Sequence, residues 1–206
     1  MKLRQYIFGK GTSVTSAPAS EPLTATEAKN WLKIGYSSDD DIVTSLIKAA
    51  RVQVENRTNL KLFTQTVTEV YDQWPDSDEQ YNQYGGFSLS WWPVQSVTSV
   101  AYIDEDGTSQ PITSTNYIVD VVSRPARIAP ADGYTFPSVD FRPKAITVTY
   151  VAGYAATASI PDDLKVAMYK LIGEWYDNRA DEVHRMPTAV DALLSDYRLE
   201  VYPKIA

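Results

Sequence analysis

The hydrophobic periodicity of this 206-residue chain changes twice along its length. Apolar residues recur at helical spacing up to residue 57 and again after residue 161, whereas residues 62–151 are rich in Thr, Val, Tyr, Trp and Pro with Gly and Asp turns. In such a chain, the helices before residue 57 must pack against the helices after residue 161 to form one helical core. We therefore predict an α+β fold, with a helical bundle formed by the N- and C-terminal helices and an inserted antiparallel β region.

Four helices are predicted from their start signals and apolar stripes. They span 24–34, 38–57, 161–178 and 188–199. Thr24 and Glu27 form a capping box, in which each side chain binds the other's backbone amide. The apolar faces, which we expect to be buried, comprise Ala28, Trp31 and Leu32 in the first helix and Ile42, Val43, Leu46, Ile47, Ala50 and Val54 in the second.

The β region is expected to form an antiparallel sheet. Ile146, Val148 and Tyr150 alternate with threonines, which is the pattern of a strand with one buried face. The predicted strands span 64–71, 87–90, 97–104, 117–121, 127–129 and 145–151. Together with the helices they make residues 23–206 one domain, which carries the β insertion at 62–151.

Residues 1–22 precede this domain and are expected to form an extended arm. Gly, Ser, Thr, Ala and Pro dominate residues 9–22, and such a segment buries too little apolar surface to offset the entropy of ordering it. Alone, the arm should be disordered. Tyr6, Ile7 and Phe8 are too few to make a core, so we expect them to dock on another chain and fold there.

Composition argues against several functional classes. The chain has no cysteine and a single histidine, His184, which removes thiol chemistry and most histidine-based metal sites. The acidic clusters stand where helix caps and turns favour carboxylates, so no catalytic pair is nominated. The net charge of -7 is the wrong sign for gripping phosphate, and no apolar run is long enough to span a membrane. We expect no enzyme activity, cofactor or metal, no tight DNA binding and no membrane partner.

Aromatic residues are the best candidates for contact with a partner. The chain contains 14 Tyr and 5 Trp, and exposed Tyr and Trp are common anchors of protein interfaces. Trp91 and Trp92 are neighbours on an extended segment, so their indoles point to opposite faces and both cannot enter one core. Tyr81 and Tyr84 lie in a polar loop suited to adaptable contacts. Burial in their own domain is the alternative for the tryptophans.

Seven segments, in order, resemble the phage head-to-tail connector family, whose members are adaptor or head-completion proteins. The segments are 23–32, 39–51, 93–100, 102–107, 148–154, 160–161 and 174–179. Glu55 and Thr58 also match the family's helix ending. None of these segments carries a chemical signature, but their order and spacing together cover the chain from Leu23 to Arg179.

The resemblance implies a structural virion protein of a tailed phage. Such proteins form a ring, dodecameric in the family, that lies between portal and tail and extends the DNA channel. The implied partners are further copies of the chain, the portal protein and tail or neck proteins, while double-stranded DNA passes without tight binding. The implied location is the neck at the head-tail junction, after synthesis in the host cytoplasm. In related connectors the C-terminal end often reaches the portal, which makes Tyr197 and Tyr202 contact candidates.

For such a connector domain, at residues 23–206, we expect the helices to make the contact between copies. Charged residues at the helix ends, such as Lys29 and Arg51, would pair across it and make it sensitive to salt. Three other interpretations remain open. The first is a carbohydrate-binding β module with helical flanks, and the second is another phage neck or tail-completion protein. The third is a small hydrolase that uses a pair of carboxylates.

Overall fold

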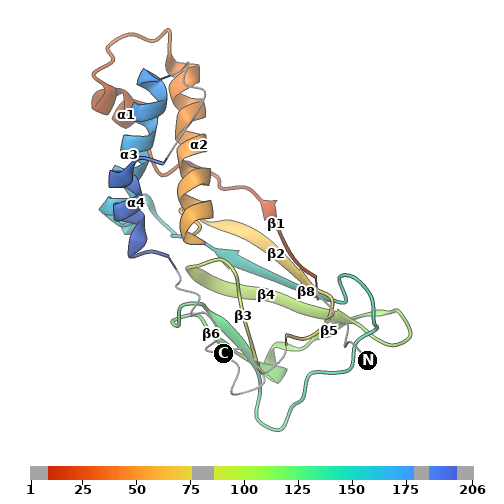
Figure 1. Cartoon of the computed structure of the whole chain (residues 1–206). Helices are drawn as coiled ribbons and strands as arrows, with labels where there is room; N and C mark the ends of the chain where they lie inside the picture. Colours follow the sequence, from red (N-terminus) through yellow and green to blue (C-terminus); the bar gives the residue numbers. More distant parts are fainter. Residues whose placement is uncertain (1–8, 76–85, 179–185, 199–206) are drawn as a thin grey trace, which may run out of the picture. The chain divides into compact units, whose positions relative to one another are not determined.

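The computed structural model describes residues 9–75, 86–178 and 186–198. It confirms the predicted α+β class and divides the chain into two compact units. The sheet unit holds the residues up to Ala17 together with Gln65–Ala152, and the helical unit holds Pro18–Thr64 and the residues from Gly153 onward. Figure 1 shows the orange N-terminal and blue C-terminal helices packed together, so the helical core is closed by two distant pieces of the chain.

The helical unit contains four helices among the described residues. They are α1 (Ala25–Leu32), α2 (Asp40–Thr58), α3 (Asp162–Asp177) and α4 (Thr188–Ser195). The predicted capping box is present, because the Thr24 hydroxyl accepts from the Glu27 amide at 3.2 Å and the Glu27 carboxylate accepts from the Thr24 amide at 2.8 Å. Lys33 and Asn59 end the first two helices in the left-handed conformation. Helix α4 stops at Ser195, short of the predicted end at residue 199.

The core of the helical unit forms where α2 and α4 pack against α3, with α1 against α2 and α3. Buried aliphatic residues fill it, among them Val43, Ile47, Ala50, Val54, Leu164, Met168, Leu171, Ile172, Val190 and Leu194. Two residues expected in the core are exposed instead: Trp31 at 48% and Ile42 at 40% of their surfaces. Because successive helical residues differ by about 100° around the axis, Ile42 turns away when Val43 faces the core.

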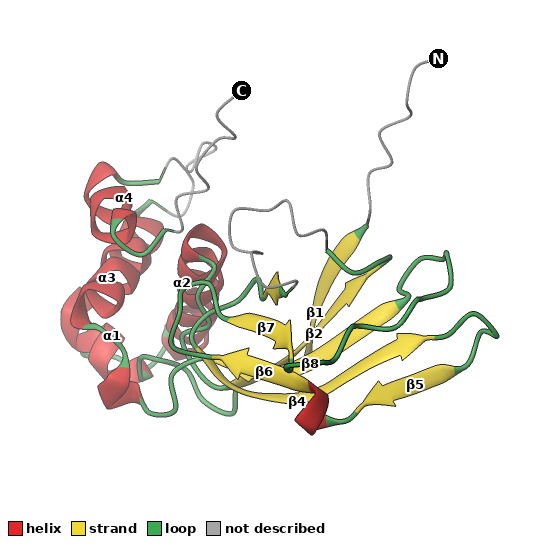
Figure 2. Cartoon of the chain, turned by 90° about the horizontal axis from the view of Figure 1, so that it is seen from below, coloured by secondary structure: helices red, strands yellow, loops and turns green. Residues whose placement is uncertain are grey.

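The sheet unit contains two antiparallel sheets. Its strands are β1 (Lys10–Ser16), β2 (Gln65–Tyr71), β3 (Phe87–Ser88), β4 (Val94–Ile103), β5 (Ser109–Ile112), β6 (Tyr117–Asp120), β7 (Arg127–Pro130) and β8 (Ile146–Ala152). One sheet has the order β1-β2-β8-β4-β5 and the other the order β3-β7-β6 (Figure 2). Six of these strands were predicted, with ends differing by up to three residues, whereas β1 and β5 were not.

Strand β1 corrects the expectation that the arm is disordered on its own. Residues 10–16 pair with β2 over a register that runs from Lys10 opposite Tyr71 to Ser16 opposite Thr66. The composition argument counted only apolar burial, and the side chains of β1 are indeed mostly exposed. Backbone hydrogen bonds to an existing strand order this segment instead. The disorder prediction is therefore wrong for residues 10–16.

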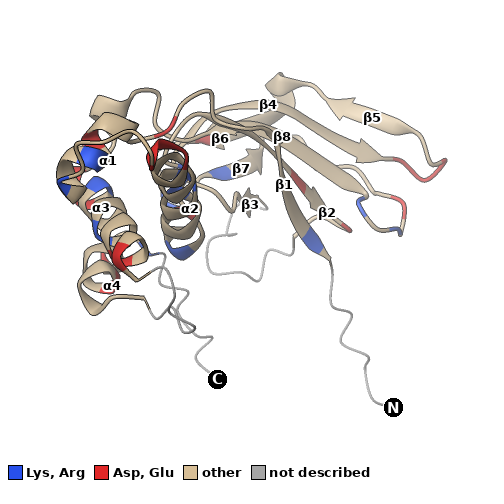
Figure 3. Cartoon of the chain, turned by 90° about the horizontal axis from the view of Figure 1, so that it is seen from above, with Lys and Arg blue, Asp and Glu red and all other residues tan. Residues whose placement is uncertain are grey.

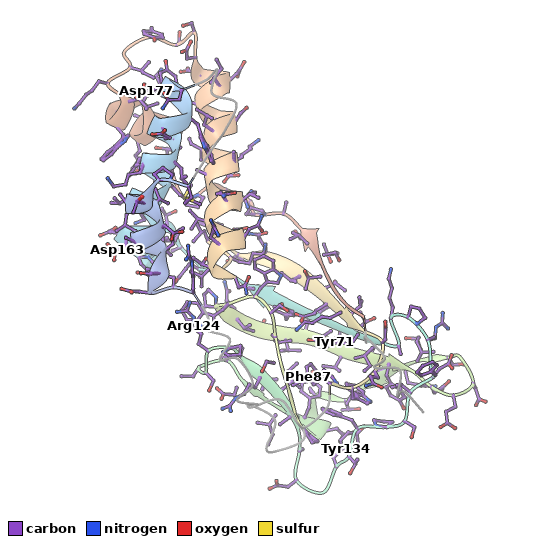
Figure 4. The ribbon with its side chains drawn as sticks, viewed as in Figure 1. Tyr71, Phe87, Arg124, Tyr134, Asp163 and Asp177 are labelled. Carbon is purple, nitrogen blue, oxygen red and sulfur yellow. The ribbon has the colours of Figure 1, made fainter. Side chains whose placement is uncertain are left out.

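The two sheets share one hydrophobic core. Burial alternates residue by residue in β2 and β8, so every second side chain points inward. Tyr71 and Phe87 meet edge to face at 5.5 Å between ring centroids, and Trp74 stacks on Phe136 at 4.4 Å. Figure 4 labels Tyr71 and Phe87, which project from β2 and β3 toward the same interior. This aromatic packing forms part of the core of the sheet unit.

Candidate assembly surfaces

A buried carboxylate connects two of the candidate contact regions in the sheet unit. Glu69 of β2 has no exposed surface. It accepts from Lys10 Nζ, Tyr71 Oη and Ser90 Oγ, each at 2.7 Å, from Tyr150 Oη at 2.8 Å, and from the Ser90 amide at 3.1 Å. Lys10 belongs to β1, and Ser90 begins the tryptophan loop. One side chain therefore anchors both the β1 strand of the arm and the tryptophan loop.

These contacts decide the charge state of Glu69. Burial alone raises the pKa of a carboxyl group, but the Lys10 ammonium and the hydrogen bonds from Lys10, Tyr71 and Ser90 outweigh burial and hold the pKa of Glu69 below its ordinary value. The pKa of Tyr150 shifts in the opposite direction. Burial and the neighbouring Glu69 charge raise the pKa of Tyr150, so this hydroxyl stays protonated and keeps donating.

We expect acid to weaken the attachment of β1. Because the folded-state pKa of Glu69 is lowered, its ionised form stabilises the fold above the ordinary value of 4.5, and this stabilisation is lost as the pH falls through the folded-state value. Urea titrations at neutral and successively lower pH, on wild type and Glu69→Gln, measure the effect. The gap in unfolding free energy between the two proteins should narrow in acid; a gap that stays constant would contradict the prediction.

The tryptophan loop, residues 90–93, lies between β3 and β4 and places its two indoles differently. Trp91 is half-buried and packs against the core of the sheet unit, while its amide donates to Tyr150 Oη at 3.3 Å. Trp92 is also half-buried, with the Arg124 guanidinium 4.8 Å from its ring centroid. Figure 4 labels Arg124 on the segment between β6 and β7. The indoles thus have separate surroundings, and contact with a partner remains a prediction.

Alanine substitutions should separate the two tryptophans. Trp91→Ala removes packing from the core and should lower the free energy of unfolding by about 2 kcal/mol, somewhat below the cost for a fully buried ring. Trp92→Ala removes the cation–π contact with Arg124 and should cost less than Trp91→Ala, about 1 kcal/mol. Chemical denaturation followed by circular dichroism measures both. A larger loss for Trp92→Ala than for Trp91→Ala would show that Trp92 is the core residue.

Most other predicted contact residues lie in segments outside the described ranges. Tyr6, Ile7, Phe8, Tyr81, Tyr84 and Tyr202 lie outside the described residues, as does His184. Tyr197 is half-buried just after α4, where its amide donates to the Leu194 carbonyl at 3.1 Å. Among the predicted contact residues that the structure describes, Trp91 and Trp92 share a loop because they are sequence neighbours, and Tyr197 lies apart from them in the helical unit.

A hollow of about 450 Å³ opens beside the three-stranded sheet. Its walls are largely apolar and include Phe87, Ile118 and Tyr134. Asp120 and Arg127 also line it and form an ion pair at 2.6 Å. Hydrogen bonds from Ser123 and from Arg127 lower the pKa of Asp120. This carboxylate stays ionised and paired, so it is poorly suited to act as a general acid.

The helical unit carries an aromatic surface that the sequence analysis missed. It consists of Trp31, Tyr36, Tyr169 and Tyr176. The rings of Trp31 and Tyr169 stack with centroids 5.2 Å apart, and the hydroxyls of Tyr36 and Tyr176 are 3.2 Å apart. Tyr36 keeps 55% of its surface exposed. An open hollow of about 520 Å³ adjoins Trp31 and is lined also by Glu27, Asn30 and Lys33.

Charged residues of the helix ends pair within their own unit. Lys29 binds Asp40 at 2.6 Å, and Arg51 binds Glu21 at 2.7 Å. Figure 3 shows such charges of both signs distributed over the helices, whereas the strands are mostly free of them. The expected salt-sensitive contact between copies therefore cannot depend on Lys29 and Arg51 unless these pairs first break.

The described ranges contain no group of three or more His, Cys, Asp or Glu side chains placed to hold a metal ion. None of the helices in that part of the chain has the length and hydrophobicity of a membrane span. The described residues present an α+β scaffold with aromatic loops and faces, and such surfaces are common at protein interfaces.

Comparison with known protein families identifies the family of this chain. The sequence profile of the Head completion protein family matches residues 21–186, and the chain belongs to this family. The predicted resemblance is thereby confirmed. A comparison with curated protein sequences found no match.

Solved structures with the same fold come from gene transfer agent (GTA) particles. A chain in the neck of an empty GTA particle, computed with C6 symmetry, is 23% identical with a TM-score of 0.73, covering 91% of this chain and 95% of that chain. A chain in the virion of the native particle gives the same identity and score, covering 91% and 94%. A chain in the native neck, computed with C12 symmetry, is 21% identical with a TM-score of 0.68 over the same shares. At these identities the likeness shows a shared fold.

Proposed function

We propose that this protein is a structural component of the neck of a tailed phage or related particle. Copies of the chain form a ring between portal and tail, and the ring extends the channel through which DNA passes. The observation that carries this proposal is the family match over residues 21–186. The correspondence over more than nine tenths of chains from GTA necks supports it, and the C12 symmetry of one of those necks favours twelve copies.

The charge of the chain supports a channel that does not hold DNA. Each copy contributes a net charge of -7, and repetition around a ring leaves few ways to present a basic lining. DNA binding through phosphate contacts needs Lys and Arg and weakens steeply with salt. We expect purified rings not to retain duplex DNA in a gel-shift assay at physiological salt. Retention with a steep salt dependence would contradict this part of the proposal.

The alternative functions have less support. A carbohydrate-binding sheet needs flat exposed aromatic platforms, but Trp91 packs against its own core and Trp92 lies beside Arg124. A hydrolase needs two carboxylates with opposed pKa shifts in one pocket, whereas the Asp120 carboxylate in the sheet-unit hollow is paired with Arg127.

Electron microscopy of the purified protein mixed with its portal protein tests the proposed function. The expected result is a ring stacked coaxially on the portal, which a tail protein then extends. Deleting the coding sequence from the phage or prophage should leave filled heads without attached tails, and restoring the chain should restore attachment. Particles that mature normally without the chain would overturn the proposal.

A further inference from the structure

Strand β1 forms one edge of the five-stranded sheet, and the side of β1 that faces away from β2 is open (Figure 1). The sheet order ends at β1, and no strand in the described ranges pairs with that side. An open edge presents unpaired backbone N–H and C=O groups, which pair readily with another chain. Natural proteins protect such an edge by keeping it short or by placing proline or charge on it.

The hydrogen-bond register shows which backbone groups of β1 reach the open edge. The Asp72 amide donates to the Gly9 carbonyl at 3.1 Å, so Gly9 and Asp72 form a hydrogen-bonded pair. Such pairs alternate along an antiparallel ladder, which assigns the amides of Gly11 and Ser13 to β2. The residues that alternate with these point their N–H and C=O groups to the open edge: Lys10, Thr12 and Val14.

Between Lys10 and Val14 the open edge lacks the usual protections. This stretch contains no proline, its register becomes irregular only after Val14, and the Lys10 ammonium is bound to the buried Glu69 at 2.7 Å. The opposite edge of the sheet, β5, is four residues long and contains Pro111. The register of β5 with β4 places Pro111 at an open-edge position, where it has no amide to donate.

The side chains of β1 define what kind of strand fits beside it. Val14 stands opposite Val67, so the two side chains share the face of the sheet that carries the core. Val14 nevertheless keeps 45% of its surface exposed, whereas Val67 keeps none. On the other face, the Thr15 and Thr68 hydroxyls are 2.7 Å apart. A strand that suits this edge is uncharged and alternates apolar side chains with small polar ones.

We propose that the open edge of β1 binds an extended segment of another neck or tail protein, which adds a sixth strand to the sheet. This inference rests on the proposed function and names one contact of the ring with its surroundings. Unpaired ladder groups are satisfied in regular order by another extended chain, which fixes the chemistry of the partner.

A second copy of the chain is a poorer occupant of this edge. Two β1 strands would pair antiparallel about a two-fold axis, whereas neighbours in a ring are related by head-to-tail contacts. The other sheet edges that a copy offers are β5, which Pro111 blocks, and β3 and β6, which have only two and four residues. The partner strand is therefore expected from a different protein.

Proline substitutions test the open edge separately from the ladder to β2. Thr12→Pro removes an amide that points to the open edge and should leave the melting temperature of the purified protein nearly unchanged. Ser13→Pro removes a ladder amide and should lower the melting temperature. A Thr12→Pro protein that melts as low as Ser13→Pro would show that the edge is wrongly assigned and overturn the inference.

The same proline should interfere with particle assembly. In cells that carry the phage or prophage without this gene, supplied Thr12→Pro should give at least about tenfold fewer tailed particles than the wild-type chain, since the added strand loses a backbone partner. Thr12→Ala is the matched control, because it shortens the same side chain but keeps the amide, and it should behave like wild type. Electron microscopy counts the tailed particles.

A charge on the edge gives a second test that keeps every amide. Val14→Lys places an ammonium where the added strand would lie, as lysine does at naturally protected edges. Val52→Lys is its control, because Val52 on α2 is 44% exposed and Val14 is 45% exposed. Only Val14→Lys should reduce the number of tailed particles, and neither variant should change the rings that the purified protein forms.

Amide hydrogen exchange measures the pairing itself. The Thr12 and Val14 amides should exchange at least about tenfold more slowly in intact particles than in purified wild-type rings, because strand pairing protects amides. Equal exchange in the two samples would overturn the inference. Protection already present in purified rings would mean that another copy covers β1, which would also overturn it.

The outcomes separate this inference from the function on which it rests. If Thr12→Pro and Val14→Lys restore tailed particles as well as wild type does, the inference is wrong and the proposed neck role stands. If either variant abolishes the ring itself, β1 contacts another copy and the inference is again wrong. A wild-type chain that forms no ring, and whose loss leaves particles normal, would overturn both.

Discussion

Replacing Gly153 with alanine should lower the free energy of unfolding by about 3 kcal/mol or more, because two costs coincide at this residue. Gly153 follows β8 with a φ of +112°, a conformation that residues with a side chain rarely adopt. A Cβ atom there would also lie 2.1 Å from the Phe63 carbonyl oxygen. That neighbour is backbone, which cannot rotate away as a flexible side chain would.

Gly107→Ala is the matched control for this prediction. Gly107 also has a positive φ, +79°, but a Cβ there would meet no atom within 4 Å. Its substitution should cost only the backbone strain, about 1 to 2 kcal/mol. Urea denaturation of the three proteins measures both losses. Equal losses for Gly153→Ala and Gly107→Ala would mean that the chain relaxes around Phe63, contrary to the prediction.

Removing the buried carboxylate of the helical unit should have an effect of similar size. Glu55 is 2% exposed and accepts from Arg51 and Lys61, both at 3.2 Å, and from the Leu62 amide at 3.0 Å. Glu55→Ala leaves these donors without that acceptor in a place that water does not reach. Breaking a buried ion pair from one side costs about 3 to 5 kcal/mol.

Two variants calibrate the Glu55 result. Glu55→Gln keeps an oxygen acceptor for the Leu62 amide and should lose less stability than Glu55→Ala. Asp162→Ala removes a solvent-exposed ion pair with Lys165 and should change stability by less than about 1 kcal/mol. Differential scanning calorimetry at neutral pH compares them. If Glu55→Ala is no more destabilised than Asp162→Ala, the cluster around Glu55 contributes nothing to stability.

The helices were predictable because their signals are local. The Thr24–Glu27 capping box and the acids before α3 lie within a turn of the helix ends they define. The strand β1 was not predictable in this way, because its order comes from pairing with β2, 50 to 61 residues further along the chain, and its own composition favours disorder. Secondary-structure propensity describes the conformation of an isolated segment, whereas β1 is ordered by its pairing with β2.

The candidate surfaces were predictable only in part. The aromatic content drew attention to Trp91 and Trp92 but not to Trp31, which looked like a core residue by its spacing. Glu69 did leave a signal, because it occupies an inward position between Val67 and Tyr71 in an alternating strand. An acid at such a position needs partners, as a buried charge is costly otherwise.

The order in which the two units occur along the chain affects how the protein folds during synthesis. Helices α1 and α2 leave the ribosome first, but α3, which covers the apolar side of α2, follows about one hundred residues later. Until then the nascent chain exposes the side chains that later form the helical core. Contacts of this sequence separation slow folding, and exposed apolar surface favours aggregation or chaperone binding. Nascent chains stalled before Asp162 should therefore be digested readily within α2 by protease, whereas released full-length chains should resist.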